Sequence, residues 1–293
     1  MAMLGNPAGV PVVVGVDGSD SSLAAVRLAA RLAAERDRPL RVVHAFIWPQ
    51  LHVPLGPSPE GPPEGGFTNA AARIVADAVA EATKAEPKIG VTGEVIEGSA
   101  SPVLLREAAE AALVVIGDRG LGGFTGLLVG SIAVQVAAHA RCPVVIMRGN
   151  ADPNRDILVG VEGRSGENDA LAFAFDEAAR RGSGVCALHA YTHPTAAEPG
   201  DMVPLVYSLD DLQAEESTVL AEALAGWSER YPDVRVTRLV VRGRPGKALV
   251  SATEKASMVV VGSRGRGGFA GLMLGSVSQV VLHHAACPVV IAR

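Results

Sequence analysis

The sequence predicts an α/β fold of two tandem domains, each a five-stranded parallel sheet with helices on both faces. Apolar, strand-like runs alternate with amphipathic helical segments along the whole chain, which is the pattern of parallel sheets. The pattern then repeats at a constant offset, as in the pair Gly117 and Gly262 (262 − 117 = 145). A repeat over the full length indicates duplication of one domain. We place the domains at residues 1–149 and 150–293, which agrees with about two domains for 293 residues.

The first repeat opens with an almost wholly apolar run, residues 10–16, that predicts a buried strand. The next turn, from Asp17 to Ser21, is rich in residues that turn the chain and cap a helix. The remaining expected elements, in order, are helix 22–36, strand 40–46, helix 68–86, strand 91–96, helix 102–111, strand 113–116, a helix capped by Ser131 that runs to about residue 140, and strand 142–148.

A glycine-rich loop comes after the fourth strand of each repeat and carries the strongest functional signal. Glycine lets the backbone turn sharply and lets a ligand approach bare N–H groups. The helix N-terminus at the end of such a loop favours an anion, although turn glycines of an ordinary α/β fold are the alternative. The residues with the shared spacing are Gly117, Gly120, Gly130 and Ser131 in the first repeat, and Gly262, Gly265, Gly275 and Ser276 in the second.

Ligands of open parallel sheets bind at the carboxyl ends of the strands, where the winding reverses. If the first and fourth strands are neighbours, Asp17 faces Gly117 across one crevice, and Glu162 faces Gly262 across a second. Asp17 could accept a hydrogen bond from adenine or ribose, hold a metal through water, or serve only as a turn residue. The sequence therefore predicts two sites per chain.

Several other chemistries do not fit the sequence. No lysine comes after the glycines as in a P-loop, and no Gly-x-Gly-x-x-Gly comes after the first strand as in a dinucleotide fingerprint. His44 and His189 each end a strand with no second ligand nearby in sequence, so we interpret them as core or edge histidines. For Ser131 and Ser276, capping with a phosphate contact fits better than a role as nucleophile, because no partner base is evident.

The composition indicates the cellular compartment and argues against some classes of partner. Three cysteines in a chain of this length do not form a disulfide framework, which favours a reducing, cytoplasmic compartment. The formal charge of −5 and the absence of a basic patch argue against nucleic acid, and no apolar run approaches a membrane span. Proline-rich stretches at 49–66 and 192–208 predict surface loops or lids.

Three sets of residues and their second-repeat equivalents make the chain resemble a tandem universal stress protein of the ATP-binding branch: Val14-Gly15-Val16-Asp17-Gly18-Ser19, Val43-His44-Ala45, and the glycine–serine motif. The resemblance covers residues 10–148 and 155–293. It implies Rossmann-like domains (of the adenine nucleotide alpha hydrolase-like type) that hold ATP, with or without Mg, in the crevice at the strand ends.

The same resemblance implies roles for individual residues. Asp17 would contact the adenosine, with Glu162 in its place in the second repeat, and Ala45 and Ala190 would line the adenine pockets. The motif glycines and serines would bind ribose and phosphates: Gly117, Gly120, Gly130, Ser131, Gly262, Gly265, Gly275 and Ser276. Both sites depart from the family pattern, since Asp118 stands where the family commonly has Ser or Thr, as at Ser263, and Glu162 and Arg164 replace Asp and Ser.

By the same resemblance, the function is nucleotide sensing for survival under stress or growth arrest, with little or no ATP turnover. Family members dimerise through the last strand, so we expect the halves to pair and whole chains to form a homodimer. Two alternatives stay open. One is a slow ATPase or nucleotidyl-transfer enzyme that uses Asp17 and a divalent ion, and the other is a nucleotide-free interaction scaffold acting through the proline-rich loops.

Overall fold

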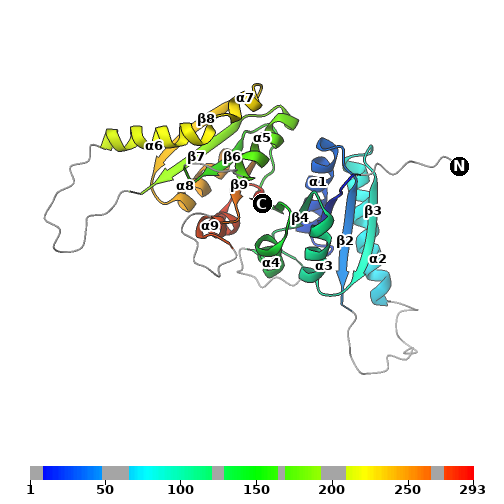
Figure 1. Ribbon diagram of the computed structural model, residues 1–293. Coiled ribbons are helices and arrows are strands. Elements are labelled where there is room, and N and C mark those ends of the chain that lie inside the picture. Colours follow the sequence, from blue (N-terminus) through cyan, green and yellow to red (C-terminus); the bar gives the residue numbers. More distant parts are fainter. Residues whose placement is uncertain (1–8, 48–65, 121–128, 164–168, 193–208, 265–273) are drawn as a thin grey trace, which may run out of the picture. The chain divides into compact units, whose positions relative to one another are not determined.

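The computed structural model describes residues 9–47, 66–120, 129–163, 169–192, 209–264 and 274–293 (Figure 1). The chain divides into two compact units, Met1–Met147 and Arg148–Arg293. Each unit is an α/β layer structure around a parallel sheet, so the predicted fold class is confirmed. The boundary expected at residues 149 and 150 stays a prediction, and both proline-rich stretches lie almost wholly outside the described residues.

The sheet of the first unit has the strand order β3-β2-β1-β4-β5, with all pairs parallel. The elements, in chain order, are β1 (Val12–Gly15), α1 (Asp20–Glu35), β2 (Leu40–Phe46), α2 (Gly66–Ala85), β3 (Val91–Glu97), α3 (Ala100–Glu107), the 3-10 turn η1 (Ala108–Glu110), β4 (Leu113–Gly117), α4 (Ser131–His139) and β5 (Val144–Met147).

The order of the strands decides which face each helix covers. The chain moves outward from β1 to β3 and then returns past β1 to β4 and β5. Because parallel crossovers are right-handed, this reversal puts α1 and α2 on one face and α3 and α4 on the other. Helices α1 and α2 pack against each other, as do α3 and α4. The reversal point lies between β1 and β4, as the sequence requires for a crevice there.

Helix α1 shows how the sequence sets a local boundary. It begins at Asp20, two residues earlier than predicted, because the Ser19 side chain accepts a hydrogen bond from the Ser22 backbone N–H at 3.2 Å. Small apolar residues then line the face that packs on the sheet. The fully buried ones are Ala25, Val26, Ala29, Ala30, Leu32 and Ala33.

The second unit repeats this topology with the order β8-β7-β6-β9-β10, again all parallel. No helix among the described residues of either unit is long and apolar enough to cross a membrane. The elements are β6 (Ile157–Val161), α5 (Asp169–Arg181), β7 (Val185–Tyr191), α6 (Leu209–Leu224), α7 (Trp227–Arg230), β8 (Val236–Arg242), α8 (Pro245–Ala252), the 3-10 turn η2 (Thr253–Lys255), β9 (Met258–Gly262), α9 (Ser276–His284) and β10 (Val289–Ala292).

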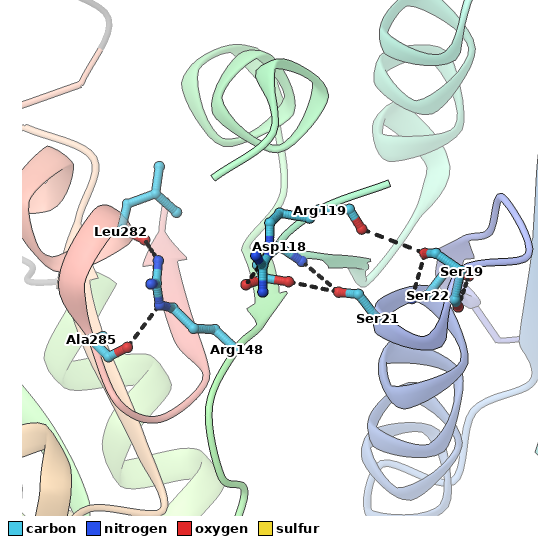
Figure 2. Close-up of polar contacts among 8 residues, drawn as sticks. All are labelled: Ser19, Ser21, Ser22, Asp118, Arg119, Arg148, Leu282 and Ala285. Carbon is cyan, nitrogen blue, oxygen red and sulfur yellow. Dashed lines mark hydrogen bonds and ion pairs between the residues drawn. The ribbon is translucent and has the colours of Figure 1, made fainter. Parts of the chain in front are cut away.

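Residues 148–150 are tied to the end of α9. The Arg148 guanidinium donates to the carbonyl oxygens of Leu282 and Ala285, each at 2.7 Å (Figure 2). Gly149 has φ +55, and a Cβ there would lie 1.9 Å from the Ala286 carbonyl oxygen. The cation therefore satisfies carbonyls that a helix end otherwise leaves without partners.

The same helix end contains a histidine with a perturbed pKa. Burial, and then the nearby His284 and Arg148, lower the pKa of His283 from its ordinary value of 6.5. The unfolded state therefore binds more protons than the folded state just below that value. Stability from this group is fully present above pH 6.5 and is lost as the pH falls through the lowered pKa of the folded state.

We therefore expect His283→Gln to reduce the acid sensitivity of folding. Between about pH 7 and about pH 5 the free energy of unfolding should fall more for the wild type than for the variant, because only the wild type has an imidazole whose protonated form is disfavoured in the folded state. Denaturant titrations at the two pH values measure both changes. Equal pH dependence in the two proteins would contradict the expectation.

Candidate functional site

The first unit has a cavity of about 450 Å3 at the carboxyl ends of β1 and β4. This volume lies within the range of about 300–1,000 Å3 that is typical of small-molecule sites. The turn after β1, the end of β2, the start of α3, the loop after β4 and the first turn of α4 all contribute to its wall. The lining residues that the sequence predicted are Asp17, Ala45, Gly117, Gly120, Gly130 and Ser131.

The second unit has a cavity of about 460 Å3 at the equivalent place. Its lining matches the first cavity at most positions, for example Ala190 for Ala45 (190 − 45 = 145). The predicted residues in its wall are Glu162, Ala190, Gly262, Gly275 and Ser276. Gly265 lies outside the described residues. The structure thus brings the other predicted residues together in two equivalent cavities, and their binding roles stay predictions.

Asp17 stabilises the turn after β1 and also lines the cavity. Its Oδ1 accepts hydrogen bonds from the Ser19 backbone N–H at 3.0 Å and from the Ser19 hydroxyl at 2.6 Å. Its Oδ2 would lie 2.3 Å from a Cβ at Gly120. Only glycine therefore fits at position 120 without moving the carboxylate, so the loop after β4 closes directly onto the turn after β1.

Asp118, which corresponds to Ser263 of the second repeat, is held toward helix α1. Its Oδ1 accepts a hydrogen bond from the Ser21 hydroxyl at 2.7 Å, and its backbone N–H donates to the same hydroxyl at 3.1 Å (Figure 2). The negative charge also lies at the N-terminal turn of α1, where the helix dipole favours it. A Cβ at Gly117 would lie 2.6 Å from Ser21 Oγ, so this glycine makes room for α1.

Ser21 was not among the residues that the sequence singled out. A comparison of the repeats contains the signal, because Ser21 and Asp118 change together to Gly166 and Ser263 at the equivalent positions. The pair therefore belongs to the first repeat alone and makes the two cavities chemically different.

The prediction that Ser131 caps its helix is wrong. Gly130 is the N-cap, Ser131 is the first helical residue, and no side chain caps α4. The same holds for α9, with Gly275 as N-cap and Ser276 as first residue. The loop instead closes through its backbone, since Gly130 N–H donates to the Asp118 carbonyl at 2.7 Å. The first-turn amides of both helices consequently have no side-chain cap and border the cavities.

His44 and His189, each two residues before the end of its strand, hold the chain at the end of the first strand of each unit. Nδ1 of His44 donates to the Val16 carbonyl at 2.7 Å, and Nδ1 of His189 donates to the Val161 carbonyl at 2.8 Å, because a carbonyl can only accept. His189 also places Nε2 2.8 Å from a carboxylate oxygen of Glu216. Glu216 comes from α6 and was missed because its partner is distant in sequence.

The charged groups in the two walls are unequal. The described wall of the first cavity carries Asp17, Asp118 and Arg119, a formal sum of −1. The described wall of the second carries Glu162 and Arg264, a formal sum of zero with His189 neutral. Within the described residues, no group of three or more His, Cys, Asp or Glu side chains could hold a metal ion.

Comparison with known proteins identifies the family. Residues 11–148 and 153–293 match the universal stress protein family. The chain belongs to this family. A universal stress protein of Mycobacterium tuberculosis strain H37Rv is 40% identical over 294 residues, covering 96% of each chain. The crystal structure of a universal stress protein from Archaeoglobus fulgidus shares the fold, with a TM-score of 0.64 at 19% identity over 96% of each chain.

A second Archaeoglobus fulgidus universal stress protein was solved in complex with dAMP. It matches 47% of this chain and 97% of its own at 26% identity, with a TM-score of 0.36. The dAMP is bound to that protein.

The Ser21–Asp118 pair should contribute to the stability of the first universal stress protein unit. Ser21→Ala removes a hydrogen bond to a charged acceptor, so we expect the free energy of unfolding to fall by about 1–2 kcal/mol. Denaturant titration measures the change. Ser217→Ala serves as control, because that exposed hydroxyl bonds only within α6 and its loss should cost little. A loss for Ser21→Ala no larger than for the control would contradict the role of the pair.

Proposed function

We propose that this universal stress protein binds one adenine nucleotide, foremost ATP, in each of its two cavities. The corresponding role is nucleotide sensing in the cytoplasm, for survival under stress or growth arrest, with little or no turnover. The resemblance of both glycine–serine motifs to the ATP-binding branch suggested this ligand. The observation that carries the proposal is the pair of uncapped helix N-termini at equivalent cavities.

The residues present fit such a ligand. The first-turn amides of α4 and the exposed hydroxyl of Ser131 offer donors to phosphate oxygens, as do α9 and Ser276 in the second unit. The Arg119 side chain is 62% exposed and can turn toward the same place. Ala45 and Ala190 are small and line the cavities, which leaves space for a flat base, and the Asp17 carboxylate in the wall offers an acceptor to a sugar hydroxyl. Mg would have to share its ligands with the phosphates.

A slow ATPase activity is the second candidate, and the His189–Glu216 contact beside the second cavity favours it. An imidazole between a carbonyl and a carboxylate can hold a proton close to a bound ligand. Turnover that depends on ATP and disappears in His189→Gln would support this candidate. Turnover that survives the substitution would remove its basis.

We also propose that whole chains pair as a homodimer, as the family resemblance implies. Multi-angle light scattering of the full chain measures the mass directly. A mass near 60 kDa, twice the 30.1 kDa of one chain, supports the pair, whereas a mass near 30.1 kDa refutes it.

Blocking each cavity tests nucleotide binding. Ala45→Phe and Ala190→Phe each put a large side chain into one cavity, so isothermal titration with ATP should fall from two sites per chain to one in either variant. Ala72→Phe, at an exposed position on α2, is the control and should keep both. Retention of two sites in both blocked variants, or no binding by the wild type, would overturn the proposal.

The unequal walls generate a further prediction. Asp118→Ser gives the first cavity the residue found at Ser263, and removing a negative charge near the phosphates should tighten ATP binding there by about three- to tenfold at low salt. Ser263→Asp should weaken the second site by a similar factor. Neutral adenosine is the control, since its affinity should not change. An equal change for adenosine and ATP would show that the substitutions act through folding.

A further inference from the structure

The two sheets differ on the face that carries α3 in the first unit and α8 in the second. The difference lies where β2 pairs with the edge strand β3, and where β7 pairs with the edge strand β8. In the first unit, Arg41 on β2 donates to Glu94 on β3 and to Glu107 of α3, each at 2.7 Å. These contacts raise the pKa of Arg41, chiefly through the hydrogen bond to Glu107. The three side chains fill this part of the face with a satisfied ionic cluster.

The second unit replaces all three members of that cluster with uncharged residues. The equivalents of Arg41, Glu94 and Glu107 are Cys186, Leu239 and Ala252 (186 − 41 = 145). In their place lies a hollow of about 1,090 Å3 along β6, β7, β8 and α8, which we call the β8 groove. Its floor is apolar and consists of Leu158, Leu188, Leu239 and Val241, together with Cys186.

Two observations indicate that this floor is suited to contact with an apolar partner. Leu239 is 38% exposed, although it lies in the middle of a strand. Burial, and then the negative charge of Asp156, raise the pKa of the Cys186 thiol, so the thiol stays neutral and apolar in character. Both residues would lose water on contact with an apolar partner, which favours association.

Basic side chains stand at both ends of the β8 groove. Three come from the carboxyl end of β8 and the start of α8, and three from the opposite end, near the starts of β6 and β8. The first set is Arg242, Arg244 and Lys247, and the second is Arg155, Arg235 and Lys255. The first repeat has no basic residue at any of these positions and has Glu97 and Glu110 in place of Arg242 and Lys255.

Most of these cations are not neutralised by the protein. Arg235 pairs with Asp156 at 2.9 Å and Arg155 with Asp152 at 3.1 Å. Among the described residues, the other four have no acidic partner within ion-pair distance: Arg242, Arg244, Lys247 and Lys255. The groove therefore attracts negative charge at each end.

The spacing of the two basic ends favours an extended ligand. The seven residues of β8 span about 23 Å at about 3.3 Å per residue. A single-headed amphiphile supplies negative charge at one end only. An extended peptide of about the same number of residues, acidic at both ends and apolar between them, supplies both charges and covers the floor.

We propose that the β8 groove docks an extended protein segment with acidic residues flanking an apolar centre. This partner site opens beside the cavity of the same unit, because Leu188 and α8 contribute to the walls of both, but its occupant is a protein segment and not a nucleotide. The first unit, with its ionic cluster and acidic edge, lacks the site. The duplication would then have left one repeat with a docking surface that the other does not share.

The test uses the full chain and a terminally blocked heptapeptide, Glu-Glu-Val-Leu-Val-Glu-Glu, in isothermal titration. The variant Leu239→Glu, Arg242→Glu, Lys255→Glu restores the residues of the first repeat and should weaken binding by at least about tenfold through like-charge repulsion. Arg238→Glu makes a charge change of the same kind at an exposed position on the opposite face of β8, and should alter binding by less than about twofold.

Three outcomes would overturn the proposal. One is equal affinity for the heptapeptide and for its glutamine counterpart, Gln-Gln-Val-Leu-Val-Gln-Gln. Another is an equal loss in Arg238→Glu and in the triple variant, which would mean attraction by net charge alone. The third is binding of decanoate without binding of the heptapeptide, which would assign the groove to a single-headed amphiphile. Thermal unfolding of each variant shows that a loss of binding is not a loss of fold.

Discussion

The reversal of winding between the first and fourth strand of each unit is the constraint on which the rest depends. Right-handed crossovers oblige the helices to leave this point in opposite directions, so neither helix layer covers the carboxyl ends of β1 and β4. The chain must close the gap with a tight turn and a glycine-rich loop. Asp17 and Gly120 meet there so closely that a side chain at position 120 would displace the Asp17 carboxylate. The strand order alone therefore creates the cavity, and the side chains that line it then determine its chemistry.

On this common scaffold the two repeats have diverged in charge more than in shape. The cavities have nearly equal volumes and matched linings. Yet the first carries the Ser21–Asp118 pair, and the second carries His189 in contact with Glu216. Beside α3 in the first unit, an ionic cluster around Arg41 takes the place of the apolar floor with basic ends that lies beside α8 in the second. Backbone geometry is preserved because the buried strands permit little change, whereas the residues at strand ends are free to differ.

The sequence predicted most of the fold because its signals are local. Apolar runs gave the strands, the constant offset gave the duplication, and β2 matches its expected range from Leu40 to Phe46. The exact helix ends were predicted less well. The sequence suggested Ser131 as the N-cap of α4, but Gly130 takes that position because the loop closes through its own backbone. Contacts between distant residues escaped sequence reasoning. Ser21 reaches Asp118 and Glu216 reaches His189 only after the sheet has formed.

The position of Arg148 matters for anyone who wishes to express the halves separately. A second half that starts after residue 148 would lose the guanidinium that holds the Leu282 and Ala285 carbonyls, and α9 would fray at its end. The chain is therefore best divided directly after β5. The few residues after that strand, which resemble a linker in the sequence, are the first structural part of the second half.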